Sequence, residues 1–402
     1  FYFTDTQASK MLNRRSLRVK AMQSLFAYNQ CRDANFNLGL AELEEKFTPN
    51  LNSMEPQDKE LLKTQKKEAK SLFAHKIQAI PLPENFEPSL EVEKAVQIVH
   101  RDFLSNAKSD RERLKKAMIM DAESLNDSFL WSISLLIAWS DLSKTEADKK
   151  SKLSPEKMQV GDYNLSKNKV IDYFRKASKF QVAALKCNVD WSAEEDTVKH
   201  WYKEVLKRDE EYAAYRRTAN PDFDKDKDIA EYLVKSLLFK AEVILSYFEE
   251  EDIRWVENKS IIRSLVSRTI RDLEADDEPK EFDLPDFSNN WEEDKEFFEQ
   301  IFDWSIDHDK EYSEIIAAKT KNWEIERLAV TDQIILKMAI SEMLNFGSIP
   351  VKVTINEYIE LSKNYSTPKS KQFVNGILDV VSNEFKENGR LKKTGRGLLD
   401  NK

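Results

Sequence analysis

Glycine is scarce in this chain, with only 7 among 402 residues. A sandwich or barrel of this length would need many turns, and turns use glycine wherever φ is positive. Leucine, alanine, lysine and glutamate, which favour helices, recur throughout instead. Hydrophobic residues make up 41% of the chain, which is enough apolar material for roughly two or three ordinary domains. We therefore predict an all-α protein.

Charge and cysteine content limit what the chain binds and where it works. The formal net charge is -9, so any nucleic-acid binding requires a local basic patch. Cys31 and Cys187 give no disulfide framework and fit a reducing cytoplasm. The longest uncharged apolar run, residues 129–139, is too short for a membrane span and predicts a buried helix. Residues 1–12 are expected to be a flexible extension, because Met11 is a plausible natural start.

The residue patterns that enzymes and metal sites need are missing from the sequence. The histidines have no spacing that places ligands on one helix face, and none lies near a cysteine. The glycines form neither a G-x-G-x-x-G run nor a P-loop, so no amide cradle for nucleotide phosphates is predicted. Carboxylate pairs are frequent, but among 72 acidic residues they indicate solvated faces. We expect no cofactor, no metal and no enzymatic activity.

Helical periodicity and helix breakers divide the chain into segments. The polar stretch 143–169 is expected to be an exposed, mobile connection, and the acidic stretch 273–290 a linker. The sequence around Trp191 recurs without a gap around Trp291, which indicates either a duplicated helical unit or a chance match between acidic amphipathic helices. Periodicity predicts helices at 13–30, within 56–80 and 91–120, and at 170–185.

Three closely connected helices are predicted near the C-terminal end. Residues 328–346 are apolar nearly all round, which only a centrally buried helix tolerates. Thr354 and Glu357 have the spacing of a capping box that opens the second helix. Thr367 and Pro368 are expected to cap and begin the third helix.

These segments resemble the NusB family. The specific strings are I-P-V-K-V-T-I-N-E at 349–357 and V-N-G-I-L-D at 374–379. The arginine-rich segment 13–28 resembles the first helix of the same family, and the long middle resembles the enlarged, Bacteroidetes-type members. The resemblance implies NusB-like helical bundles with a large helical insertion.

The resemblance also implies how the chain is divided. Residues 13–31 and 291–387 are expected to form the NusB-like domain, although they lie at opposite ends of the sequence. Residues 32–290 are expected to be a helical insertion, and residues 388–402 a flexible basic tail. No function is implied for the insertion.

The function implied by the resemblance is transcription antitermination without catalysis. The family binds a boxA-type RNA element of ribosomal-RNA leader transcripts, together with NusE, a small-subunit ribosomal protein, in the RNA polymerase antitermination complex. NusB-like domains also occur fused to RNA methyltransferases, but no glycine-rich cofactor domain follows here. The alternative is a helical adaptor in transcription or ribosome assembly, whose acidic middle binds proteins without direct RNA contact.

Two segments are expected to form one cationic face for RNA. Arginines in the first turns of a helix oppose the macrodipole, so they indicate either phosphate contacts or an ordinary solvated basic end. The second segment joins a helix start, hydroxyls and lysines, which suit phosphate. Phe373 is placed to stack on an unpaired base or to pack at the core edge. The predicted RNA-binding residues are Arg14, Arg15, Arg18, Ser366, Thr367, Lys369, Ser370, Lys371 and Phe373.

A second surface is expected to face the protein partner. On a helical wheel Leu17, Ala21 and Leu25 share the buried side with Tyr28, which leaves Phe26 outward on the opposite side. An outward phenylalanine needs a reason, and a partner provides one. The family positions that face NusE correspond to Phe26, Tyr28, Asp332 and Glu342.

Overall fold

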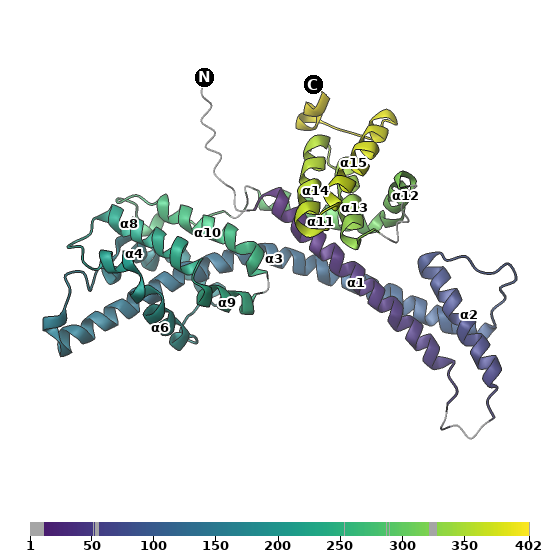
Figure 1. Cartoon of the computed structure of the whole chain (residues 1–402), viewed down its shortest axis with the longest axis horizontal. Helices are drawn as coiled ribbons and strands as arrows, with labels where there is room; N and C mark the ends of the chain where they lie inside the picture. The colour runs from purple at the N-terminus through teal and green to yellow at the C-terminus, as the bar shows by residue number, and fades with distance from the viewer. Residues whose placement is uncertain are drawn as a thin grey trace. The chain divides into compact units, whose positions relative to one another are not determined.

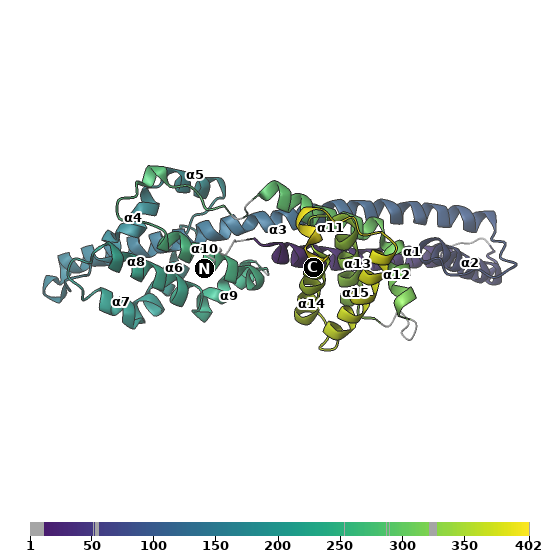
Figure 2. The same cartoon turned by 90° about the horizontal axis from the view of Figure 1, so that it is seen from above.

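The computed structural model describes residues 12–50, 52, 56–252, 254–286, 288, 290–320 and 328–401. The expected flexible extension lies almost wholly outside the described residues. Every regular element in the described part is a helix, which confirms the all-α prediction. The helices form two compact units (Figures 1 and 2), and none of those described is long and apolar enough to cross a membrane. Unit 1 is built mainly from Asp121–Trp291, and unit 2 from Arg14–Met120 and Glu292–Lys402.

Unit 2 joins segments from both ends of the sequence. The first half of α1 packs on α13, and helices α12 to α15 pack on one another as a bundle (Figure 1). The helices of this unit are α1 (Arg14–Lys46), α2 (Lys59–Gln78), the start of α3 (Leu90–Leu153), α11 (Trp291–Asp307), α12 (Asp309–Lys319), α13 (Val330–Asn345), α14 (Val351–Tyr365) and α15 (Ser370–Glu387).

The second half of α1, α2 and the start of α3 form a three-helix arm (Figure 1). Phe73 of α2 is fully buried between two other rings, stacked on Phe36 at 5.4 Å and edge-on to Phe103 at 6.1 Å between centroids. The arm lengthens α1 beyond the predicted end at residue 30, because Phe36, Leu40 and Leu43 continue its apolar stripe. The expected insertion boundary at residue 32 therefore falls inside a helix.

The C-terminal bundle follows the predicted order of three helices, with two corrections at their starts. Helix α13 is centrally buried, as predicted. Helix α14 begins at Val351, so Thr354 lies in its first turns, buried, and its hydroxyl donates to Glu342 rather than capping the helix. Helix α15 begins at Ser370, two residues after Pro368. The capping-box prediction is wrong because the Thr354 hydroxyl is bonded to the buried Glu342 carboxylate and does not cap the helix.

The segment after α15 contacts the bundle. The Thr394 amide donates to the Gly347 carbonyl at 2.9 Å, and Lys393 Nζ donates to the Phe346 carbonyl at 3.0 Å. A short 3-10 turn, η7 (Gly395–Asn401), follows. These contacts tie part of the expected flexible tail to the loop after α13.

Unit 1 consists of short helices packed around the second part of α3. The apolar run 129–139 is buried, as predicted, with Phe129, Leu130 and Trp139 fully enclosed. The helices are α4 (Lys169–Lys176), α5 (Ser178–Lys186), α6 (Glu195–Glu204), α7 (Glu210–Tyr215), α8 (Phe223–Tyr232), the π-helical turn η4 (Leu233–Leu238), α9 (Glu242–Glu251) and α10 (Trp255–Arg271).

The polar stretch 143–169 is not a mobile connection. Its first part continues α3 as far as Leu153, and its remainder is held by buried polar side chains. Asp162 accepts from Lys150 Nζ at 2.7 Å, and Asn164 Nδ2 donates to the Tyr215 carbonyl at 2.8 Å. Asn168 caps α4 by accepting from two backbone amides. The prediction failed because polar composition alone does not distinguish a solvated loop from one satisfied internally.

The sequence match around Trp191 and Trp291 is not matched by local structure. Trp191 lies in a turn before α6, which has 10 residues, whereas Trp291 is the first residue of α11, which has 17. Trp191 is 7% exposed in an aromatic cluster of unit 1. The different local structures favour a chance match over a duplicated unit.

Candidate functional site

The arginines at the start of α1 each meet a carboxylate within unit 2. Arg14 pairs with Glu293 and lies 3.6 Å from Asp294. Arg15 forms two parallel hydrogen bonds to Glu357 of α14, both at 2.8 Å. Burial alone would raise the pKa of Glu357, but Arg15 and Arg18 outweigh burial and hold that pKa below its usual value. The side chains of Arg14 and Arg15 remain 32% and 51% exposed.

Arg18 lies in the core of the bundle. Its Nε and Nη2 donate to the two carboxylate oxygens of Glu342 at 2.7 and 2.8 Å. Thr354 and Tyr358 donate their hydroxyls to the same carboxylate at 2.8 and 3.1 Å. The side chains of Arg18 and Glu342 are 3% and 0% exposed. All the charge of this pair is therefore compensated inside unit 2.

This buried pair corrects two expectations. Arg18 was expected to contact RNA and Glu342 a protein partner, but neither side chain reaches the surface. The sequence does contain the signal for Arg18, which stands three residues before Ala21 and seven before Leu25, on the buried face of the helix. The charge of Arg18 predicted a surface position, whereas its position on the helix indicated the core.

One residue of the second predicted RNA segment and one predicted partner residue are also internal. Ser370 is 2% exposed and donates its hydroxyl to Asp332, which is 5% exposed, at 2.6 Å. Ser370 therefore does not present a phosphate contact, nor does Asp332 present a partner contact, because both side chains are buried. Thr367, Lys369 and Lys371 are exposed, and Ser366 and Phe373 are half-buried.

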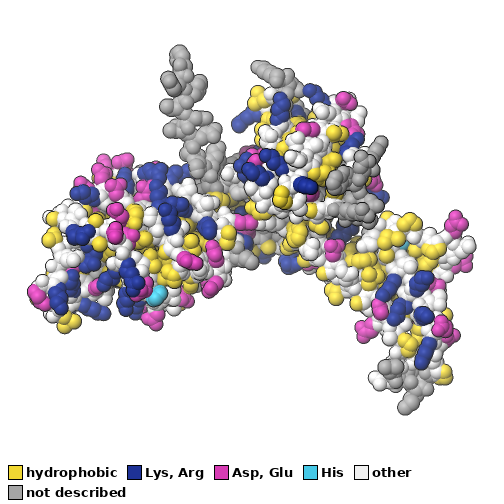
Figure 3. Space-filling model, in the orientation of Figure 1, with side chains coloured by type: hydrophobic (Ala, Val, Ile, Leu, Met, Phe, Trp, Pro, Cys, Tyr) yellow, Lys and Arg dark blue, Asp and Glu magenta, His cyan; other side chains and the backbone are white. Residues whose placement is uncertain are grey.

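The two predicted RNA segments lie toward opposite ends of α13. Arg18 pairs with Glu342 near the C-terminal end of that helix, and Ser370 bonds to Asp332 in its first turn. Ten residues of helix separate the two carboxylates, which is about 15 Å along the axis. Basic and acidic side chains are mixed on the visible face of the unit (Figure 3). The structure thus places two separate basic edges where one cationic face was expected.

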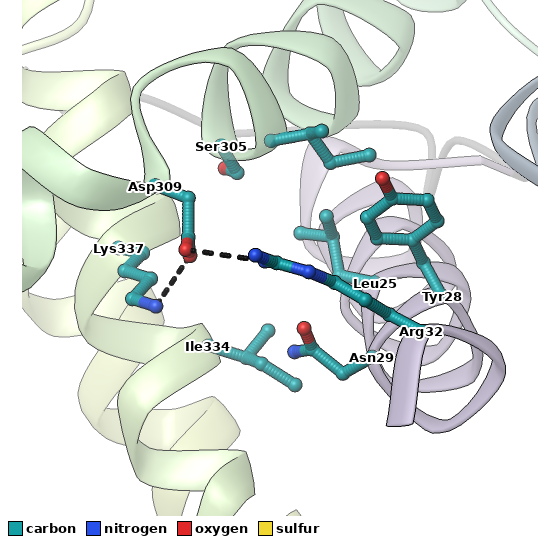
Figure 4. Close-up of a pocket in the computed structure, with 9 residues that line it drawn as sticks. Leu25, Tyr28, Asn29, Arg32, Ser305, Asp309, Ile334 and Lys337 are labelled. Carbon is teal, nitrogen blue, oxygen red and sulfur yellow. Dashed lines mark hydrogen bonds and ion pairs between the residues drawn. The ribbon is translucent and has the colours of Figure 1, made fainter. Parts of the chain in front are cut away.

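The predicted partner residues Phe26 and Tyr28 lie on one stretch of α1. Phe26 is 41% exposed, as the helical wheel predicted. Tyr28 is half-buried and lines a small cavity of about 20 Å³ between α1, α11, α12 and α13. The Asp309 carboxylate accepts a hydrogen bond from Lys337 Nζ, and its Oδ2 lies 3.6 Å from Arg32 Nη1 across this cavity (Figure 4). The cavity has room for a water molecule and not for a substrate.

Among the described residues, no cluster of histidine, cysteine, aspartate or glutamate is arranged to hold a metal ion. The two cysteines are both free thiols and half-buried.

Comparison with known proteins places the bundle in a family. The chain matches the NusB family over residues 257–383. It is similar to a transcription antitermination protein NusB of Dictyoglomus turgidum, with 37% identity over 29% of this chain and 78% of that protein. The chain belongs to the NusB family. It is also 44% identical to the NusB protein of Salinibacter ruber and 46% identical to that of Chloroherpeton thalassium, in each case over 26% of this chain.

The chain spans 66% of the Salinibacter relative and 50% of the Chloroherpeton relative. No solved structure gives a significant match. The NusB match includes α11 to α14 and most of α15, and it also reaches into α10 of unit 1. Helix α1 lies outside the matched range, yet it packs on α13 inside it. The N-terminal helix and the NusB-matched helices therefore share one core.

Proposed function

We propose that this chain is a transcription antitermination factor that binds a boxA-like RNA element of ribosomal-RNA leader transcripts together with NusE, without catalysing a reaction. The observation that carries the proposal is the packing of the arginine-rich helix α1 against the NusB-matched helix α13. The relatives named as transcription antitermination proteins support it. RNA polymerase in an antitermination complex is the proposed setting.

The proposed RNA contacts are the members of the predicted set that are exposed, together with the half-buried Arg14. Arg14 and Arg15 form one edge, and Lys369 and Lys371 with Thr367 form the other. Ion pairs at exposed positions contribute only about 0–1 kcal/mol, so exchanging a carboxylate for an RNA phosphate costs Arg14 and Arg15 little. Arginine also binds phosphate through two parallel hydrogen bonds.

The proposed partner surface is the exposed side of α1 around Phe26, with Tyr28 at its border. An exposed ring of this size is a suitable anchor for a protein interface.

A salt titration tests the RNA contacts at the first edge. We expect the double variant Arg14→Ala, Arg15→Ala to bind a boxA-like single-stranded RNA more weakly and with a shallower dependence on salt, by roughly 0.7 in logarithmic slope for each RNA phosphate that the variant no longer neutralises. Fluorescence anisotropy with a dye-labelled RNA measures both quantities. The matched control is Lys310→Ala, Lys386→Ala, which removes the same charge at two other exposed positions of unit 2. Equal slopes for all three proteins would refute the assignment.

Glu357→Gln tests the same edge in the opposite direction. Losing its carboxylate partner leaves the Arg15 guanidinium available to phosphate, so RNA affinity is expected to rise severalfold at low salt. Glu314→Gln, an exposed acid on α12, changes the net charge equally and serves as control. The same gain in both variants would mean that only net charge matters.

Phe373 has its own test, since its ring is half-buried. Phe373→Ala is expected to weaken RNA binding by about 1–3 kcal/mol through loss of base stacking. An unchanged affinity with a lower unfolding midpoint would assign the ring to the edge of the core.

A protein-only adaptor is the second candidate function. It is favoured by the pairing of Arg14, Arg15 and Arg18 with carboxylates, which neutralises the basic helix in the free protein. Pull-down with labelled leader RNA, in the presence and absence of NusE, separates the two functions. Co-purification of NusE without RNA would favour the adaptor.

A further inference from the structure

Unit 1 contains a cavity whose walls are largely aromatic. Its volume is about 220 Å³, and it lies between α3, the turn before α6, α9 and the start of α10. Trp131, Trp191, Tyr247 and Trp255 line it. This cavity belongs to neither of the edges proposed for RNA, which are both in unit 2.

The rings around the cavity meet at steep angles. Trp131 and Trp191 are edge-to-face, with centroids 4.7 Å apart and planes at 79°. Trp191 and Tyr247 are tilted by 43° at 6.1 Å. Rings set at such angles wall a space on more than one side, whereas a parallel stack would present only its edges. Aromatic faces carry partial negative charge and attract cations.

The charged groups that line the cavity are all acidic. They are Asp127, Glu251 and Asp252, and no lysine or arginine is among the described residues that line it. Asp252 is paired with Arg254, at 2.8 Å from Nε, and Asp127 forms a hydrogen bond with the Cys187 thiol. Glu251, which is exposed, is therefore the carboxylate left to face the cavity. Burial raises the pKa of Tyr247, and Glu194 and Glu251 raise it further, as expected in a negative environment.

Two wider hollows share lining residues with this cavity and are also lined by acidic side chains. One, of about 460 Å³, shares Trp191 with it, and the other, of about 820 Å³, shares Tyr247. Arg175 pairs with Asp141, and Lys199 pairs with Glu195. His200 is the one basic side chain among the described residues that line the hollows. The acids that line them are Asp141, Asp190, Glu195, Asp196, Glu242 and Glu250.

We propose that this face of unit 1 binds a basic protein segment, one of whose arginine or lysine side chains enters the aromatic cavity. Ring faces and carboxylates together favour a guanidinium or ammonium group over a neutral or anionic one. The cavity is smaller than the roughly 300–1,000 Å³ of small-molecule sites, which suits a single side chain. The adjoining acidic hollows would take its basic neighbours in the segment.

The test uses the full chain and a short dye-labelled peptide that alternates serine with arginine. Trp131→Leu removes one aromatic wall and is expected to weaken binding roughly tenfold, whereas Trp131→Phe keeps a ring and most of the affinity. Glu251→Gln, an exposed change with little effect on folding, is expected to weaken binding severalfold. The matched control Asp228→Asn removes an exposed charge of α8 outside the hollows and should leave affinity unchanged. Anisotropy at physiological salt measures all four.

Four outcomes would overturn the proposal. They are no binding of the peptide by the wild-type chain, equal affinity of wild type and Trp131→Leu, equal binding of a peptide with neutral citrulline in place of arginine, and binding of free arginine amide as tight as that of the peptide. The last outcome would make the cavity a site for small cations. Circular dichroism checks that each variant is folded. Because the RNA titrations use unit 2 variants, failure of RNA binding leaves this test intact.

Discussion

Arg18 and Glu342 are separated by 324 positions in the sequence and meet in the core of unit 2. Removing two charges from water is costly, and their attraction compensates only when every hydrogen-bonding site is used. Thr354 and Tyr358 complete the set on the carboxylate. Loss of one partner would leave an uncompensated charge in an apolar interior.

Arg18→Met is therefore expected to lower the free energy of unfolding of unit 2 by about 3–5 kcal/mol. The double variant Arg18→Met, Glu342→Leu should regain much of this loss, because no charge stays buried. Urea unfolding followed by circular dichroism measures both variants. Arg15→Met breaks an exposed pair and should cost no more than about 1 kcal/mol; a similar cost for Arg18→Met would contradict the buried pair.

Cys187 gives a prediction that depends on pH. Burial, and then the neighbouring Asp127, raise the pKa of its thiol from about 9 to about 11. The thiolate is the reactive form, so in a Cys31→Ser background alkylation by iodoacetamide should still be accelerating at pH 10. Because the folded pKa is the higher one, the thiol's contribution to stability holds below pH 9 and is lost as the pH rises toward 11. A rate that levels off near pH 9 would disprove the shift.

The burial of single residues could be predicted from the sequence where residue type and helical position agree. Leu17, Ala21 and Leu25 were predicted to be buried and Phe26 exposed, and the structure confirms each. The prediction failed for Arg18 and Asp332, since a charged side chain is assigned to the surface unless its buried partner is known. Glu342 and Ser370 are those partners, and they lie far away in the sequence.

Among the elements, the three-helix arm depends on one close contact. A Cβ atom added to Gly39 of α1 would lie 2.7 Å from the buried ring of Phe73 and 2.9 Å from Val99. Gly39→Ala gains about 1 kcal/mol of helix propensity, but Phe73 is held by two other rings and has no room to move. We expect a net loss of stability.

The opposite result is expected for Gly376 in α15. A Cβ there meets nothing within 4 Å, so Gly376→Ala should stabilise the helix by up to about 1 kcal/mol. Thermal unfolding of the two variants and the wild type measures whether each substitution raises or lowers stability. A stabilising Gly39→Ala would show that the helices of the arm separate to accommodate the methyl group.

The existence of the helices could be predicted better than their ends. Helix α13 was predicted within two residues, because its apolar residues surround it completely. The stretch 143–169 was misassigned because Asp162 and Asn168 find their partners in segments distant from it in the sequence. Patterns of neighbouring residues in the sequence do not predict such long-range hydrogen bonds.

Over the whole molecule, the main part of unit 1, Asp121–Trp291, is inserted in the sequence between the two parts of unit 2. Each unit has its own buried core, built from residues such as Phe129 and Trp139 in unit 1 and Ile335 and Leu336 in unit 2. We expect differential scanning calorimetry to resolve two transitions, of which Arg18→Met lowers only one. Glu314→Gln, an exposed change, should move neither. A single transition lowered as a whole would mean that the two cores unfold cooperatively.

The resemblance of the two chain ends to one family predicts that they form one bundle, with an insertion between residues 32 and 290. Unit 2 contains both ends, and the main part of unit 1 ends at Trp291. The first boundary was placed at residue 32, far from Asp121. Residues 32–120 build an arm on α1 that the family resemblance does not describe. Packing between α1, α2 and α3 is tertiary, so periodicity within each helix does not reveal it.

The pairing of α1 with α13 has a consequence during synthesis. The ribosome releases the first helix well before the last ones, and at about 5–20 residues per second the delay is on the order of tens of seconds. Throughout that time Leu17, Ala21 and Leu25 have no neighbours to cover them, and Arg18 has no counter-ion. We therefore expect holdase chaperones to bind the nascent chain until its final helices emerge.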